Sequence, residues 1–448
     1  MRRPSLTEVF PWLLGLLATV AYATLSILRF RNFTVNSWDN AIFEQAVQGY
    51  SKFDAPIVVI KGPGYNILGD HFSPIDAVLG PVYRVFGHGE TLLVAQAVLI
   101  GISVAVITAL AMRHLAWIGA WVGLLYAVSF GLQNAVMADF HEVAFALPFL
   151  ALAGAAYVDG RFDHVVWWSL PLFLVKEDLG FTVAMIGVAL WIVGERRKGL
   201  LVGIGGVLGL ILVVTVIIPS FNAGNSYDYT DTLGGDGGIV GTFFSHLDTK
   251  ALTVLITLGV GGLLAVMSPW ALLLVPTLLW RYLGGVEFYW GTDWHYSMIL
   301  MPIVFVALVD VIVQRPWARW PGLAIATGFG VWTVFFMNSA FVPSGSPLTL
   351  LADSATWHRD ARAEGALAAM KVIPRGSYVE SDLGMLKQLV SDYHVYWRGT
   401  VGDAVPDYIV FDRRLSDEDP ALYGLTAHHH NYEKVFDDGQ WIVVARVR

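Results

Sequence analysis

The stretch Thr91–Met112, TLLVAQAVLIGISVAVITALAM, decides the fold class. It carries no charged side chain, and about 20 mostly apolar residues are enough to cross a bilayer as a helix. Comparable stretches occur at 9–28, 115–137, 142–158, 200–219, 251–267, 296–314 and 320–341, and shorter ones at 164–175, 179–194 and 269–283. These stretches together predict a polytopic α-helical membrane protein with about eleven transmembrane helices.

The composition of the 448 residues supports this class and excludes others. Hydrophobic residues make up 56% of the chain and charged residues only 14%, whereas soluble proteins carry about 25% charged residues. A large soluble enzyme and a disordered chain are therefore excluded. The absence of cysteine removes disulfides, thiolate metal sites and a cysteine nucleophile. The net charge of −8 argues against a nucleic-acid partner.

The basic residues of the short turns predict the orientation, because such residues stay on the cytoplasmic side. With eleven spans, all of these turns fall on one side: Arg2/Arg3, Arg113, Arg161, Arg196/Arg197/Lys198 and Arg315/Arg319. Arg29 and Arg31 are the exceptions. The N-terminus is then cytoplasmic, and the first apolar stretch is a retained signal anchor. We expect a multi-pass protein of the bacterial inner membrane, with residues 30–90, 220–250, 281–296 and 342–448 on the outer side.

The chain divides into two predicted domains, a transmembrane part over 1–341 and a soluble part over 342–448. The second part has nearly the charge density of a soluble protein. It predicts a small outer α/β domain, with a helix near Ala355–Met370 and strands at Ser377–Glu380, Tyr408–Phe411 and Trp441–Arg446.

Ionisable residues near apolar spans are costly, so they are usually paired or functional. The first such cluster is Ser37–Gln45, with Asp39 and Glu44. Ser37 predicts the N-cap of a helix that ends near Ser51 and lies along the membrane surface. Asp39 would lie in its first turn, where a carboxylate also simply complements the helix dipole.

The second cluster is Asp70-His71, which Phe72 separates from Ser73-Pro74. Proline after a capping serine predicts the start of a second surface helix. An Asp–His pair in the turn before it can orient a substrate, relay a proton or ligate a metal. A turn whose polar groups satisfy one another is the competing interpretation.

Three further clusters share the same predicted side. Asp139-Phe140-His141-Glu142 lies between two spans, where Asp139 and Glu142 are expected to share a helix face. Lys176-Glu177-Asp178 lies between two short apolar runs, and its competing interpretation is a self-neutralising turn. The aromatic-rich stretch 281–296 contains Arg281, a fixed cation suited to phosphate, together with His295 and Tyr296.

Carboxylates, cations and aromatic rings on one outer face suggest chemistry on a lipid-linked sugar. Glycosyl transfer needs a carboxylate that deprotonates the acceptor hydroxyl. It also needs cations or hydrogen-bond donors for the departing phosphate.

The four motifs SWDNAIFEQ, GDHFSP, DFHE and VKEDLG, at 37–45, 69–74, 139–142 and 175–180, resemble those of a bacterial membrane family. This family is catalogued as domain of unknown function 2079, and it resembles the GT-C superfamily of glycosyltransferases. The resemblance covers roughly residues 10–340. It implies a GT-C-like fold, a large first outer loop with two surface helices, and a polyprenyl-phosphate sugar donor. It also places the catalytic acid near the start of the first loop helix, where Asp39 lies. GT-C enzymes often pair two adjacent acids, whereas Asn40 follows Asp39 here, so Asp70 is the alternative base.

The preferred prediction is a membrane glycosyltransferase with Asp39 as general base. Asp70 and His71 would position the acceptor or support a divalent metal, which is the one cofactor that the sequence suggests. Asp139, His141 and Glu142 would line the cavity. Lys176 and Arg281 would hold the donor phosphate, with Lys176 oriented by Glu177 and Asp178. The acceptor remains open between a lipid, an envelope glycan and a protein.

Two other functions compete with this prediction. A transporter or lipid flippase would use intramembrane charges for ion coupling, and it predicts symmetry between the two halves of the chain. No such symmetry is evident in the sequence. A non-catalytic envelope scaffold would bind partners through its tail, and it predicts that the charged clusters tolerate substitution.

Overall fold

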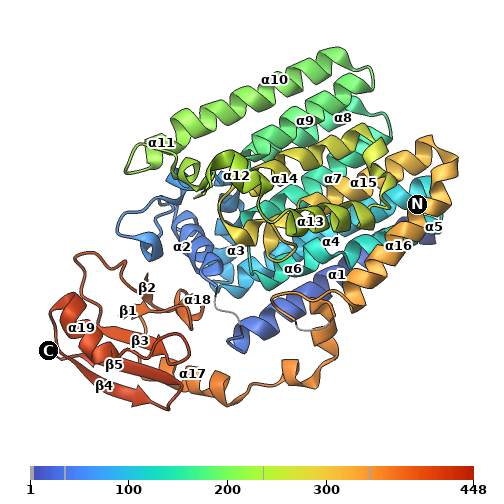
Figure 1. The fold of residues 1–448 in the computed structure, drawn as a ribbon. Helices are drawn as coiled ribbons and strands as arrows, with labels where there is room; N and C mark the ends of the chain where they lie inside the picture. The colour runs from blue at the N-terminus through green and yellow to red at the C-terminus, as the bar shows by residue number, and fades with distance from the viewer. Residues whose placement is uncertain (1–4, 35–36, 236, 343–344, 448) are drawn as a thin grey trace.

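The computed structural model describes residues 5–34, 37–235, 237–342 and 345–447. Arg2, Arg3 and Asp236 lie outside these ranges. The helices of the larger part pack side by side around one apolar core (Figure 1). They are α1 (Leu6–Arg31), α4 (Glu90–Leu115), α5 (Ile118–Ala127), α6 (Phe130–Met137), α7 (Ala146–Val158), α8 (Phe162–Ser169), α9 (Leu179–Ile192), α10 (Arg196–Leu212), α11 (Ile218–Phe221), α12 (Gly238–Phe244), α13 (Leu247–Val260), α14 (Leu274–Leu283), α15 (Leu300–Gln314) and α16 (Arg319–Phe335).

Within the described residues, five helices are long and apolar enough to cross a membrane, or six if the bent pair α12–α13 is one span. They cover 6–31, 90–115, 118–137, 196–221 and 295–314. The predicted number of eleven is not confirmed. Several predicted spans are interrupted by 3-10 turns, such as Leu170–Leu174 after α8 and Pro269–Leu273 before α14. Pro171 in the first turn removes a hydrogen bond by which α8 could continue, whereas Pro269 begins the second turn directly after its N-cap, Ser268.

The first loop contains the two expected helical segments. The first is α2 (Asp39–Ser51), and the second is the 3-10 turn Pro74–Leu79 followed by α3 (Gly80–Val85). Ser37 was expected to be the N-cap of this helix. The N-cap of α2 is Trp38 instead, and its side chain makes no capping hydrogen bond. All residues from Asn40 to Val47 are buried. This part of the helix is therefore enclosed by protein on all sides, whereas the sequence predicted a helix along the membrane surface.

The C-terminal part forms a five-stranded mixed sheet with helices, at one end of the bundle (Figure 1). Its elements are α17 (Ala361–Lys371), β1 (Tyr378–Ser381), α18 (Leu386–Leu389), β2 (His394–Trp397), β3 (Tyr408–Asp412), α19 (Pro420–His428), β4 (Tyr432–Asp437) and β5 (Trp441–Arg446). The strand order is β2-β1-β3-β5-β4, with β1 parallel to β2 and β3, and β5 antiparallel to β3 and β4. Strands occur at all three predicted positions, whereas β2 and β4 were not predicted.

Candidate active site

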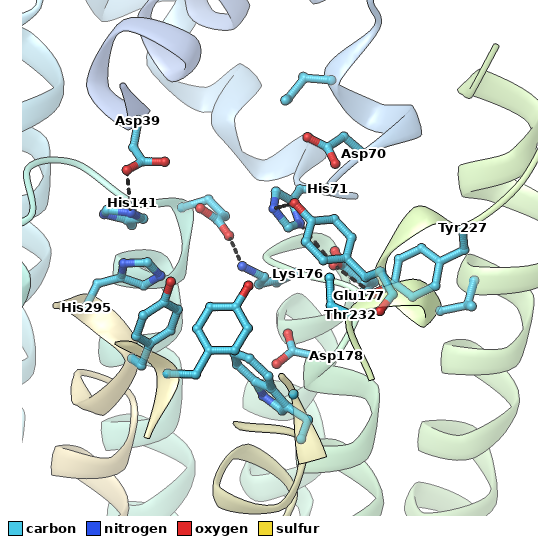
Figure 2. Close-up of a pocket in the computed structure, with 18 of the residues that line it drawn as sticks. Asp39, Asp70, His71, His141, Lys176, Glu177, Asp178, Tyr227, Thr232 and His295 are labelled. Atoms are coloured by element: carbon cyan, nitrogen blue, oxygen red, sulfur yellow. Dashed lines mark hydrogen bonds and ion pairs between the residues drawn. The ribbon is translucent and has the colours of Figure 1, made fainter. Parts of the chain in front are cut away.

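A cavity of about 670 Å³ lies where the first loop meets the helical bundle. Its polar wall comes from the start of α2, the loop before Pro74, the turn between α6 and α7, and the turn before α9 (Figure 2). Ten of the thirteen residues predicted for the site line it together, and eight of them are Asp39, Asp70, His71, His141, Glu142, Lys176, Glu177 and Asp178. His295 and Tyr296 line it as well. Segments far apart in the sequence thus supply one polar surface.

Asp39 points into this cavity beside His141 (Figure 2). The Asp39 side chain is 49% exposed, and its Oδ2 lies 3.5 Å from His141 Nε2. The His141 ring in turn stacks on His295, with 3.5 Å between the ring centroids. Burial opposes ionisation, but His141, with His71 and Lys176 beyond it, holds the pKa of the Asp39 carboxyl below its usual range. Asp39 is therefore an ionised, accessible carboxylate, as a general base requires.

Lys176 is the central cation of the polar wall. Its Nζ lies 2.8 Å from Glu142 Oε1, and both side chains are largely shielded from solvent. Asp178 lies next to this pair, and one of its oxygens is buried without a hydrogen-bond partner in the described part of the chain. Burial raises the pKa of Asp178 to about 6, although the positive charge of Lys176 opposes this. Glu142 thus orients Lys176, a role that was expected of Glu177 and Asp178.

Glu177 binds His71 instead. Its two carboxylate oxygens accept from His71 Nδ1 and the Phe72 amide, each at 3.1 Å. Tyr229 lies on the other side of His71, with its hydroxyl 2.7 Å from Nε2. Asp70 is ion-paired with Lys61. These contacts fix a second polar group of residues across the cavity from Asp39.

The remaining wall of the cavity is apolar and aromatic. Phe181 of α9 faces four residues of α10 and the π-helical turn that follows it: Leu210, Ile211, Val214 and Thr215. Aromatic rings complete the wall: Trp280, Phe288, Tyr289 and Tyr296. α10 is also an outer helix, with large apolar side chains exposed along it. The cavity therefore combines a charged end with an apolar side, which suits an amphiphilic ligand.

Three predicted site residues do not line the cavity. Asp139 is buried, and its carboxylate pairs with Lys387 of α18 at 2.6 Å. The expectation that Asp139 lines the cavity with Glu142 is wrong, because α6 ends at Met137 and Asp139 has a left-handed φ of 69°. The spacing that aligns side chains on a helix does not hold through such a break.

Glu44 and Arg281 are turned inward. Glu44 accepts a 2.7 Å hydrogen bond from the Tyr83 hydroxyl, and burial raises its pKa to about 8. Arg281 is fully buried and donates to the carbonyls of Tyr289 and Gly291, at 2.6 and 2.5 Å. Arg281 therefore stabilises the conformation of the aromatic loop. It does not line the cavity, so it is not placed to bind a phosphate there.

A metal site is not formed by the charged residues that the structure describes. No group of three or more of their His, Asp and Glu side chains is arranged to hold an ion. Asp70 and His71, the expected candidates, are instead bound to Lys61, Glu177 and Tyr229. We derive no metal-dependent step from them.

Among the lining residues that sequence reasoning missed are Lys61, Tyr227 and Tyr229, which contact the predicted charged residues. Tyr227 and Tyr229 come from the glycine-rich loop that follows α11, and Tyr227 donates to Glu177 at 3.4 Å. The Tyr-Asp-Tyr spacing in an otherwise small and polar loop was the available signal.

Fold and site together describe a protein with several apolar helices long enough to cross a membrane, one cavity with charged and apolar walls, and a small α/β domain at one end of the helical bundle. The chain belongs to the family described as predicted membrane protein (DUF2079), whose model matches residues 29–385. Its fold is similar to that of ArnT from Cupriavidus metallidurans, a GT-C glycosyltransferase solved with undecaprenyl phosphate bound, at a TM-score of 0.59 and 14% identity over 97% of each chain. None of the curated proteins matches the sequence.

Proposed function

We propose that this protein is a membrane glycosyltransferase of the bacterial inner membrane, which moves a sugar from a polyprenyl-phosphate donor to a cell-envelope acceptor on the outer face. The supporting observation is that one cavity holds an ionised carboxylate, a buried lysine and an apolar side wall. Transfer from a lipid-linked donor needs all three groups. The carboxylate accepts the proton of the acceptor, the lysine binds the phosphate, and the apolar wall accommodates the first prenyl units. The GT-C-like fold, and the undecaprenyl phosphate bound to ArnT, support the same class of donor.

Asp39 performs the proton transfer in this proposal. Its carboxylate accepts the proton of the acceptor hydroxyl while that oxygen forms a bond to the anomeric carbon of the sugar. His141, 3.5 Å away, keeps Asp39 ionised before the step. The bond between the anomeric carbon and the phosphate oxygen breaks, and the electron pair leaves with the polyprenyl phosphate.

Lys176 stabilises the departing phosphate. Its ammonium group faces the cavity and is held by Glu142 at 2.8 Å (Figure 2). A charge-assisted hydrogen bond in a poorly hydrated site is stronger than one in water. Asp70 and His71 would contact the acceptor, because they line the same cavity as Asp39 and are fixed by Lys61 and Glu177. The rings of Tyr289 and Tyr296 would pack against the sugar.

Sugar transfer from radiolabelled polyprenyl-phosphate donors tests the proposal in vesicles that contain the purified protein. Loss of the base in Asp39→Asn should lower the rate about 10³-fold, within the usual range for general base catalysis. Asp54→Asn is the matched control, because Asp54 is exposed three residues after α2 and does not line the cavity. Near-normal transfer by a folded Asp39→Asn variant would remove Asp39 as the base. Absence of transfer by the wild type with every donor and acceptor class would overturn the function.

A further inference from the structure

The C-terminal domain contacts the helical bundle through a buried ion pair that the proposed reaction does not use. Lys387 of α18 has a side chain with no exposed surface, and its Nζ lies 2.6 Å from Asp139 Oδ2. The Phe30 ring at the end of α1 lies 5.6 Å from the same ammonium group. A fully buried lysine is uncommon and needs a partner. Here that partner is separated from it by 248 positions in the sequence.

Asp139 belongs to the turn that carries His141. Gln96 of α4 bridges this turn, since it donates to the Asp139 carbonyl at 2.9 Å and accepts from the His141 amide at 3.0 Å. The same Asp139 carbonyl lies 3.4 Å from His141 Nδ1. This contact directs the other ring nitrogen, Nε2, at Asp39. The position of the imidazole thus depends on a turn that Lys387 holds from outside the bundle.

The same domain also holds the helix that carries Asp39. Gln45 and Gln48 of α2 donate to the carbonyls of Val395 and Val390, at 2.9 and 3.0 Å. At the N-terminal end of α2, the Trp38 ring packs on Trp397 of β2, with 4.4 Å between the centroids. Both partners of the Asp39–His141 contact are therefore attached to the C-terminal domain by separate sets of contacts.

We propose that the C-terminal domain is a working part of the active site, and that Lys387 is a positioning residue that holds His141 against Asp39. This inference rests on the proposed function, because it assigns the pair a role in transfer. The structural part of the inference is that Lys387 fixes the turn at Asp139–His141. This part depends only on the contacts described above. A displacement of about 1 Å in such a pair costs up to about 10²-fold in rate.

Lys387→Met tests the inference in the full-length protein, with Lys387→Arg as the conservative variant and Lys434→Met as the matched control. Lys434 is an exposed lysine of the same domain, paired only at the surface with Asp437. We expect Lys387→Met to lower kcat about 10-fold or more while the KM for the donor changes less than about 2-fold, because no donor contact is lost. Lys387→Arg should recover much of kcat, and Lys434→Met should leave both constants unchanged.

Hydrogen exchange tests whether Lys387 fixes this turn, and it needs no transfer assay. In Lys387→Met, amides of the turn at 138–141 and of the first turns of α2 should exchange faster, and those of α13 and α15 should not. If Lys387→Met unfolds the domain, the double variant Lys387→Met/Asp139→Asn removes both charges and serves in its place. Unchanged exchange, or faster exchange with wild-type kcat, overturns the inference and leaves the proposed function intact. A wild-type chain without transfer overturns the catalytic role together with the proposed function, and the exchange data still decide whether Lys387 fixes the turn.

Discussion

Two buried lysine–carboxylate pairs have their carboxylates three positions apart between α6 and α7, and they lead to different parts of the molecule. Glu142 binds Lys176 at 2.8 Å, and this pair faces the cavity. Asp139 binds Lys387 at 2.6 Å, and this pair joins the helical bundle to the C-terminal domain. Each pair joins a lysine to a carboxylate, and burial is nearly complete in both. The difference lies in what surrounds each lysine.

Lys176 retains about 15% of its side-chain exposure, and that exposed part faces a space large enough for a ligand. Lys387 retains none and is enclosed by protein. A buried ion pair offers little net stability over an apolar pair, but it is costly to break on one side only. We therefore expect the first pair to exchange its partner for a ligand, and the second to stay closed.

Among changes to these two pairs, the largest effect is expected from Lys176→Met. If this variant behaved like a variant of Lys387, the difference between the two pairs would not hold. Loss of a charge-assisted hydrogen bond to phosphate should weaken donor binding by about 10- to 100-fold. The C-terminal domain should stay as resistant to proteolysis as in the wild type. Binding of a fluorescent polyprenyl-phosphate donor in nanodiscs measures the affinity, with the exposed Lys52→Met as control. Unchanged donor affinity would show that Lys176 is structural, as Lys387 is.

Much of the cavity could be predicted from the sequence, because ionisable groups are rare in an apolar chain. Asp39, His71, His141, Glu142 and Lys176 were found for this reason, and the structure brings them together. Their common location followed from assigning them all to one side of the membrane. No periodicity within one helix was needed for it.

The directions of individual side chains could not be predicted. Asp139 and Glu142 flank a helix break, where a left-handed residue turns one carboxylate away from the other. Arg281 appears in the sequence as a free cation among aromatic residues, but carbonyls of its own loop satisfy it. Lys387 lies in a segment of ordinary charge density, so no compositional signal marks it.

The number of membrane spans could not be predicted either, for a related reason. Apolar stretches such as 164–175 and 269–283 are divided between a helix and a 3-10 turn. Hydropathy measures how apolar a segment is, but helix length depends on where proline and packing interrupt the hydrogen-bond ladder.

Asp139→Asn should give the next largest effect. It tests the Lys387–Asp139 pair by removing the charge of the carboxylate rather than that of the lysine. Asparagine tolerates the left-handed φ, so the turn can persist, but Lys387 loses its counter-charge. We expect kcat to fall about 10-fold, while donor affinity stays within about 2-fold of the wild type. Proteolysis should release the C-terminal domain faster.

A double-mutant cycle with Lys387→Met tests whether the two residues act as a pair. The effects should be non-additive, because Lys387 and Asp139 contact each other directly. Additive losses in kcat would show that Asp139 acts through a contact other than Lys387. Loss of donor binding in Asp139→Asn alone would place Asp139 with the cavity after all.

The smallest effect is expected from Asp178, and it tests whether the cavity-facing pair responds to charge. Its carboxyl has a pKa of about 6 and lies among Lys176, Glu177, Glu142 and His71. As the pH falls from 8 to 5, Asp178 takes up a proton and a negative charge near the phosphate is lost. A phosphodiester donor keeps its charge over this range. Its affinity should therefore rise a few-fold on acidification, as expected for one charge removed a short distance away.

Asp178→Asn is the matched variant, because it removes the charge at every pH and keeps the shape of the side chain. This variant should bind the donor more tightly at pH 8, and its donor affinity should depend less on pH. Any pH dependence that is left would come from His71. The wild-type affinity for the donor, measured at several pH values beside that of Asp178→Asn, checks this. An equally steep profile in both proteins would assign the response to His71, whose raised pKa reflects Glu177 and Asp70 acting against burial and the charge of Lys176. A flat wild-type profile would show that the phosphate lies away from Asp178, and hence away from Lys176.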